Sequence, residues 1–207
     1  MKDLKMVLGV VGVCVVLVGL MIFGLSKMSG EGAVVDENKL ADGALMATRS
    51  GEVKVRVVNF SDMECPACKA AHGVIGGLRK TEGVEFVFRH YPLRIHKHAV
   101  ISAKAVEAAR QMGKGWEMMD LLFEKQEEWT GVSDIEKKLE GYAVSLGLDS
   151  KDFMVRIASS QTDQAVAADR QLAESMSLGG TPTIFVNGVM VSPQFVMEKV
   201  REALTIK

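Results

Sequence analysis

Two cysteines separated by two residues are the groups of this chain best suited to chemistry. They lie in the run Cys65-Pro66-Ala67-Cys68, which follows a strand pattern at 53–60 and opens a helix pattern at 65–80. The first turn of a helix offers unpaired N–H groups and the positive end of the helix dipole, and both favour a thiolate over a thiol. We therefore expect Cys65 to have a lowered pKa and to be the attacking sulfur, with Cys68 placed to close a disulfide onto it. Pro66 suits the first helical turn because its missing N–H has no role there.

Three other interpretations of the cysteine pair stay open. A structural disulfide is disfavoured because so small a loop restrains little of the unfolded chain. Zinc would need two more ligands, and no second C-x-x-C or histidine pair at helical spacing accompanies the first. Copper would need a histidine in addition to Cys65 and Cys68. We assign no metal ligand, because each of the four histidines is expected to be a surface or hydrogen-bonded residue: His72, His90, His96 and His98.

Composition narrows the class of function. The chain has 207 residues and a formal net charge of -1, so there is no electrostatic basis for binding nucleic acid. Aromatic residues make up 6%, which provides no stacking platform for bases. Cys14 lies in the hydrophobic N-terminus, so the rest of the chain holds a single cysteine pair. One such pair is typical of a catalytic or metal site rather than a stabilising framework.

The N-terminus predicts a membrane anchor. Residues 6–25 carry no charge and are long enough for a helix that spans a bilayer, which needs about 20 residues. Lys2 and Lys5 favour a cytoplasmic N-terminus, with the rest of the chain outside. A cleaved signal peptide is the alternative, but the apolar run is longer than usual and no A-x-A site follows it. We expect a single-pass protein of the bacterial inner (cytoplasmic) membrane, with its catalytic part on the extracytoplasmic, periplasmic side.

After the anchor at 1–25 we expect a linker at 26–50, rich in glycine and acidic residues with a short helix at 39–46, and a folded domain at 51–207. Ser133 is a predicted N-cap, because Glu136 follows at capping-box spacing. Four residues at helical spacing are predicted core: Trp116, Met118, Met119 and Phe123. The predicted elements are strand 53–60, helix 65–80, strand 84–91, a helical block over 96–178 that includes helices 149–159 and 163–177, a hairpin of strands 183–186 and 189–191 around Asn187-Gly188, and a final helix to Leu204.

Four stretches carry a resemblance to a known family. They are Phe60–Lys69, Phe86–Leu93, Gly113–Phe123 and Gly180–Gly188. In this order they resemble the active-site stretch, the second strand, a segment of the helical insert and the cis-proline loop of DsbA-like thioredoxin-fold proteins. The resemblance covers roughly residues 51–204. It implies an α/β architecture, a thioredoxin fold with an all-helical domain inserted at about 96–178.

The resemblance also implies roles for particular residues. Cys65 would be the nucleophile that forms a mixed disulfide with the substrate, and Cys68 would resolve it. Pro182 would be cis and face the dithiol, and Thr181 would offer backbone hydrogen bonds to an extended substrate segment. These roles imply a monomeric oxidase that introduces disulfides into exported proteins. It would use no cofactor beyond the Cys65–Cys68 disulfide and be reoxidised by a quinone-linked membrane partner of the DsbB or VKOR-like type. The alternatives are a disulfide reductase or isomerase and, in another class, a copper-binding thioredoxin-like metallochaperone.

The chain departs from the family pattern beneath the active site. Family members commonly carry an acidic residue six positions before the first cysteine, where this chain has Asn59, which cannot accept a proton at neutral pH. Asp62 and Glu64 are expected to be solvated. Pro66 and Ala67 leave no histidine between the cysteines. We therefore expect a Cys65 pKa below about 8.5 but not extreme, and a potential between about -120 and about -270 mV.

Overall fold

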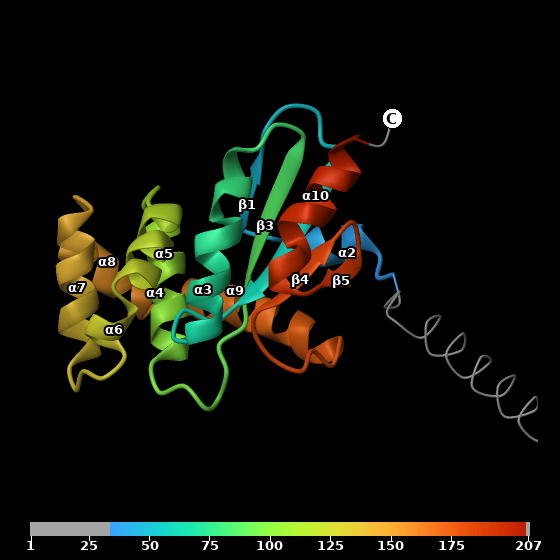
Figure 1. Cartoon of the computed structure of the whole chain (residues 1–207). Helices are drawn as coiled ribbons and strands as arrows, with labels where there is room; N and C mark the ends of the chain where they lie inside the picture. The colour runs from blue at the N-terminus through green and yellow to red at the C-terminus, as the bar shows by residue number, and fades with distance from the viewer. Residues whose placement is uncertain (1–33, 206–207) are drawn as a thin grey trace, which may run out of the picture. The chain divides into compact units, whose positions relative to one another are not determined.

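The computed structural model describes residues 34–205 of the chain (Figure 1). The predicted membrane anchor at 6–25 lies outside these residues. Among the helices from residue 34 to residue 205, none combines the length and the hydropathy that crossing a bilayer requires.

One mixed sheet forms the centre of the described residues. Its strand order is β1-β3-β2-β4-β5, in which β2 and β3 run parallel and the other neighbours run antiparallel. The strands are β1 (Met46–Arg49), β2 (Val55–Ser61), β3 (Val84–His90), β4 (Thr183–Val186) and β5 (Val189–Val191). The parallel pair needs a crossover connection, which α3 (Pro66–Ile75) and a 3-10 turn, η1 (Gly76–Lys80), supply. The dithiol sequence therefore follows a central strand of the sheet.

Alternation along the strands separates two apolar layers. Val55 and Val57 of β2 belong to a large core shared with α3, with the C-terminal helix α10 (Val196–Thr205) and with the helices between β3 and β4. Val58 and Phe60 point to the opposite face of the sheet. There they pack with residues of α2 (Glu37–Ala41) and α9 (Ser160–Ser175). Each face of the sheet is therefore covered by helices.

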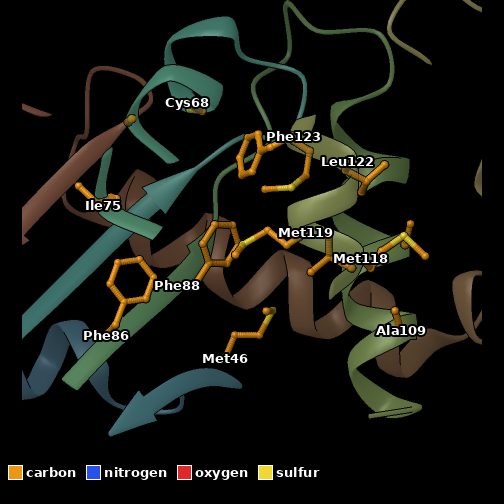
Figure 2. Packing of buried hydrophobic residues seen from close by; sticks show 14 of the residues in the cluster. Met46, Cys68, Ile75, Phe86, Phe88, Ala109, Met118, Met119, Leu122 and Phe123 are labelled. Carbon is orange, nitrogen blue, oxygen red and sulfur yellow. The ribbon is translucent and has the colours of Figure 1, made fainter. Parts of the chain in front are cut away.

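The block of helices between β3 and β4 is the predicted insertion. Its elements are α4 (Ala99–Gln111), α5 (Gly115–Glu124), α6 (Gln126–Trp129), α7 (Ile135–Ser145), α8 (Ser150–Ile157) and α9. Met118 and Met119 of α5 are fully buried, and the Met119 side chain lies beside Phe88 of β3 (Figure 2). The predicted core residues are confirmed, with Trp116 partly buried against the same core. The insertion therefore shares its core with the sheet.

Two helix starts differ from the predictions. The Ser133 N-cap is wrong, because Asp134 caps α7 by accepting a bond from the Lys137 N–H at 3.1 Å. Aspartate is as good an N-cap residue as serine. The capping-box spacing therefore placed the start of this helix one residue too early, at Ser133 instead of Asp134. The start of α9 is earlier than predicted, since Ser159 is its N-cap and the helix begins at Ser160.

The prediction of a linker at 26–50 is wrong for residues 37–49, because these residues form a helix, α2, and a strand, β1. Residues of α2 and β1 belong to the domain, and β1 pairs antiparallel with β3, so Met46 lies opposite Phe88. Leu40 is fully buried, and Arg89 donates to its carbonyl oxygen at 2.9 and 3.1 Å. Glycine and acidic residues in the segment masked these few inward-facing side chains. The short helix predicted at 39–46 is in fact α2, followed by β1.

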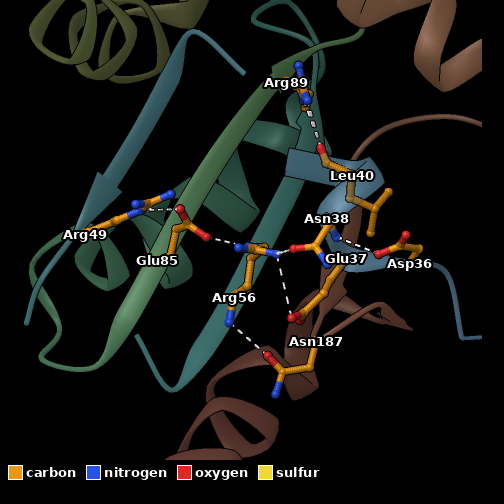
Figure 3. A network of polar contacts seen from close by, with 9 residues as sticks. All are labelled: Asp36, Glu37, Asn38, Leu40, Arg49, Arg56, Glu85, Arg89 and Asn187. Atoms are coloured by element: carbon orange, nitrogen blue, oxygen red, sulfur yellow. Dashed lines mark hydrogen bonds and ion pairs between the residues drawn. The ribbon is translucent and has the colours of Figure 1, made fainter. Parts of the chain in front are cut away.

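Ion pairs attach this N-terminal segment to the sheet (Figure 3). Glu85 of β3 is buried and receives hydrogen bonds from Arg49 of β1 and Arg56 of β2. Arg56 also donates to the Asn38 side chain of α2 at 3.0 Å, and its backbone N–H donates to Asn187 at 2.8 Å. Asn187 has a positive φ of 48°, as the predicted hairpin turn requires. A single buried carboxylate thus ties three strands together.

The chain closes with a short 3-10 turn, η2 (Pro193–Phe195), and α10. Together they form the predicted last helix. Val196 and Val200 are its buried residues. They join the core that also contains Cys68 and Ile75 of α3. The C-terminal helix therefore supports the helix on which the dithiol lies.

Candidate active site

The dithiol lies where β2 ends and α3 begins. Cys65 is the N-cap residue of α3, with an extended backbone at φ -77° and ψ 121°, and Pro66 occupies the first turn. Cys68 lies one turn further along the helix. The two side chains differ in access, because Cys65 is 7% exposed and Cys68 is 1% exposed. A substrate sulfur can therefore reach Cys65 more readily than Cys68.

Both cysteines are free thiols with defined backbone contacts. The Cys65 sulfur lies 3.5 Å from the carbonyl oxygen of Thr181. The backbone N–H of Asp62 points at the Cys68 sulfur, 3.4 Å away. Gln126 of α6 holds the loop from the other side, because its amide donates to the carbonyls of Met63 at 2.7 Å and Cys65 at 3.1 Å. The attacking sulfur is thus fixed between the cis-proline loop and the insertion.

The two thiols have opposite acid strengths. The pKa of Cys65 is lowered to about 5, chiefly because the Cys68 thiol donates to its sulfur, with further help from the N–H groups of Cys68 and Ala67. Burial opposes this effect. Burial also raises the pKa of Cys68 well above its ordinary value, and so does its bond to Cys65. The predicted lowering of the Cys65 pKa is confirmed in direction, and it is larger than the sequence suggested.

The bond between Thr181 and Pro182 is cis, as the family resemblance implied. The loop that contains it precedes β4, whose first residue, Thr183, lies opposite Phe60 of β2. This register brings residues 181 and 182 alongside the dithiol, although Thr181 is 116 residues from Cys65 in the sequence. The contact between Thr181 and Cys65 places a backbone carbonyl next to the attacking sulfur.

The expectation that Asp62 and Glu64 are solvated is wrong. The Asp62 side chain is fully buried and accepts bonds from the N–H groups of Glu64 and Leu93 and from the His96 ring, each at 2.8 Å. Glu64 accepts a bond from the N–H of His98. These carboxylates close the loop before Cys65 and attach it to residues 91–98. Apart from the Glu64 N–H, the donors belong to residues 31 to 34 positions further along the chain, which no local sequence pattern reveals.

Three of the histidines are satisfied by hydrogen bonds. His72 stacks on Phe123 at 4.7 Å and bonds to Asp120 at 2.9 Å. His96 bonds to Asp62, and His98 contacts the Val132 carbonyl at 3.1 Å. Within residues 34–205, no group of three or more histidine, cysteine or acidic side chains is arranged to hold a metal ion.

His90 differs from the other three. It is 3% exposed, and neither ring nitrogen has a hydrogen-bond partner among residues 34–205. The expectation of a surface or satisfied residue is therefore wrong for it. Ser61, the last residue of β2, was also not predicted as a site residue. A polar residue at an inward-facing position of an otherwise apolar strand could have identified it. Asn59, Ser61 and His90 all have this property.

Comparisons with known proteins agree with this architecture. The sequence model of a family described as thioredoxin matches residues 49–205. A curated relative, Na(+)/H(+) antiporter NhaA 1 of Mycolicibacterium vanbaalenii, is 42% identical over 140 residues, which are 64% of this chain and 22% of that protein. The chain therefore spans about a fifth of the length of the curated relatives it matches.

Two solved structures share the fold. Oxidised BdbD from Bacillus subtilis is 22% identical and superposes with a TM-score of 0.66, covering 77% of this chain and 92% of BdbD. The thiol-disulfide exchange protein alpha-DsbA2 from Wolbachia pipientis is 21% identical with a TM-score of 0.68, covering 80% of this chain and 90% of that protein. At these identities the likeness concerns the fold.

Proposed function

This chain belongs to the thioredoxin family, as a DsbA-like thioredoxin-fold protein, and we propose that it is a thiol-disulfide oxidoreductase that works through Cys65 and Cys68. One observation carries the proposal. The more accessible thiol has a pKa lowered to about 5, and it lies at a helix N-terminus beside a cis-proline loop. A thiolate at neutral pH is the nucleophile that thiol-disulfide exchange requires.

We propose the oxidase direction. A client thiolate attacks the Cys65 sulfur of the oxidised pair, the Cys65–Cys68 bond breaks, and Cys68 takes the electron pair and a proton. The client's second thiolate then attacks the client sulfur of the mixed disulfide and releases Cys65 as a thiolate. The client loses two electrons and the dithiol gains them. A stabilised Cys65 thiolate favours this direction, because it stabilises the reduced form of the pair.

The client would bind in extended form beside Thr181. The carbonyl oxygen of Thr181 already lies 3.5 Å from the Cys65 sulfur, so a backbone that pairs with this residue would carry its cysteine to the attack site. Backbone pairing of this kind is independent of client sequence. It therefore supports a broad set of cysteine-containing clients rather than one dedicated partner.

We further propose that the protein works outside the cytoplasm and is tethered by residues 6–25, with clients among exported proteins. An oxidising compartment keeps such a pair available as a disulfide. The curated relatives are named Na(+)/H(+) antiporters, so a domain similar to this one forms part of proteins assigned to ion transport. Reoxidation would pass two electrons to a quinone-linked membrane partner of the DsbB or VKOR-like type, without a bound cofactor and with the chain as a monomer.

The test uses the full-length chain and its Cys65→Ala and Cys68→Ala variants. The wild type should oxidise a dithiol peptide, and Cys68→Ala should accumulate mixed disulfides that Cys65→Ala does not form. Ser102→Ala serves as a control, because that buried hydroxyl bonds to the Ala99 carbonyl within α4. A wild type inert toward the peptide would refute the activity. Thiol trapping from cells tests the direction, since a mainly reduced pair would favour a reductase.

A further inference from the structure

Three buried polar side chains lie on the sheet face that carries α3. Asn59 and Ser61 alternate with Phe60 along β2 and so share one face. His90 lies directly opposite Ser61 in the parallel register of β2 and β3, and its side chain points to the same face. All three residues are at most 3% exposed. We call Asn59, Ser61 and His90 the polar row.

The polar row has unused hydrogen-bonding capacity. Asn59 Oδ1, Ser61 Oγ and both ring nitrogens of His90 have no nitrogen or oxygen partner within the part of the chain that the structure describes. Buried polar groups are almost always paired with protein or ordered water. Four such atoms on one face therefore indicate bound water, a role in the reaction, or both. Phe88 packs edge-on against the imidazole at 5.1 Å, which fixes the ring without pairing it.

The polar row lies next to the thiol that must exchange a proton. The Ser61 hydroxyl acts on Cys68 and lowers its pKa, against the larger opposing effect of burial. Cys68 gains a proton each time the disulfide opens and loses one each time it closes. Asn59 cannot supply that proton, and Asp62 is already occupied by three hydrogen bonds. Glu64 accepts the His98 N–H, so both carboxylates of the loop before Cys65 are engaged by other donors.

We propose that His90 is a positioning residue for the Cys68 proton, acting through Ser61 and buried water. This inference rests on the proposed function. When the Cys65–Cys68 bond breaks, Cys68 takes the electron pair, and water held by Ser61 and His90 gives it a proton. The imidazole donates its proton to that water from one nitrogen and accepts a proton from solvent at the other, so it stays neutral and changes tautomer. Closure of the disulfide reverses each step.

Burial keeps the imidazole of His90 neutral, although a carboxylate faces it. On α4, Glu107 faces it but is held by two bonds from Arg110, at 2.8 and 2.6 Å. On α9, Asp169 accepts a bond from the His90 backbone N–H at 2.9 Å and pairs with Arg89. Burial lowers the pKa of His90 to about 4. A neutral ring has one N–H and one lone pair, as a relay needs.

The experiment separates attack by Cys68 from attack by Cys65. A chromogenic aromatic disulfide reacts first with Cys65, releasing one coloured thiolate, and then Cys68 resolves the mixed disulfide and releases a second. In full-length His90→Phe the second release should slow about 100-fold, the lower range for general acid–base assistance. The first release should stay unchanged. Ser61→Ala should slow the second release in the same direction, and Ser102→Ala should match the wild type.

Rescue and pH dependence test for more than a structural role. In the double variant Asn59→Asp with His90→Phe, a carboxylate on the same face should restore the second release about tenfold, and only at pH values where that carboxylate is ionised. An unchanged second release in His90→Phe would overturn the inference. So would equal slowing of both releases, or a selective loss that Asn59→Asp does not rescue. A wild type that gives no second release would instead refute the proposed function.

Discussion

Removing the Cys68 thiol should raise the pKa of Cys65 by a calculable amount. The donor from Cys68 is the largest cause of the lowered pKa, which is about 5 in the intact pair. A hydrogen bond to a charged group contributes about 1.5–3 kcal/mol, and one pKa unit corresponds to about 1.4 kcal/mol. In Cys68→Ala the Cys65 pKa should therefore rise to between about 6 and about 7. It should stay below 9.0, because the backbone N–H of Ala67 still points at the sulfur.

Thiolate absorbance in the ultraviolet, followed against pH, measures this directly in the reduced full-length chain. Cys65→Ala identifies the titrating group, since it should abolish the step near pH 5. Ser102→Ala controls for an unrelated buried change. Two results would refute the reasoning. One is a wild type in which no thiol titrates well below the ordinary Cys65 pKa of 9.0. The other is a Cys68→Ala variant in which Cys65 has the same pKa as in the wild type.

The same lowered pKa links stability to pH. The folded Cys65 pKa of about 5 lies below its ordinary value of 9.0, so between these values the unfolded chain binds more protons than the folded chain. The thiolate therefore stabilises the reduced form fully above the ordinary pKa. This stabilisation is lost as the pH falls through about 5. Urea unfolding of reduced and oxidised chains should show the difference, because the oxidised pair has no thiolate.

Three further predictions concern residues outside the sulfur pair. Asp62→Ala should lower the free energy of unfolding by about 3 kcal/mol, because three donors lose their acceptor, and urea denaturation measures the change. Leu40→Ala should destabilise by about 2–5 kcal/mol, whereas Leu45→Ala, at a side chain 51% exposed, should have little effect; equal effects would contradict the folded N-terminal segment. The pKa of His90, lowered from 6.5 to about 4, predicts stability that is present above pH 6.5 and lost as the pH falls toward 4. In His90→Phe that acid-sensitive part of the unfolding curve should disappear.

Much of this fold follows from local patterns in the sequence. The alternation before Cys65 and after Gly83 predicts β2 and β3, and Asn187-Gly188 predicts the β4–β5 turn, because each signal is contained within a few neighbouring residues. β1 escaped prediction because it is four residues long and only Met46 of them is buried. Its place in the sheet depends on pairing with β3, which no local pattern encodes.

The candidate site divides in the same way. The C-x-x-C spacing predicts the dithiol, and the resemblance places the cis-proline loop beside it. The supporting contacts were not predictable, because each depends on segments far apart in the chain. Asp62 bonds to His96, and Gln126 bonds to the carbonyl of Cys65, 61 residues away. Polar residues in such contacts look like ordinary solvated residues until the fold brings their partners close.

The absence of an acid at position 59 fits the proposed oxidase direction. A carboxylate beneath the helix could carry protons for Cys68, but its charge would also raise the pKa of the Cys65 thiolate and weaken the preference for the reduced form. Burial keeps His90 neutral at physiological pH, so it places no charge beneath the pair. Exchanging Asn59 for Asp should therefore have two opposed effects. Proton exchange at Cys68 should become less dependent on His90, while the Cys65 pKa rises and the pair becomes a weaker oxidant. The rate of the second release and the Cys65 pKa, both measured in Asn59→Asp, decide whether proton supply and oxidising strength are linked. A faster second release with an unchanged Cys65 pKa would contradict the link.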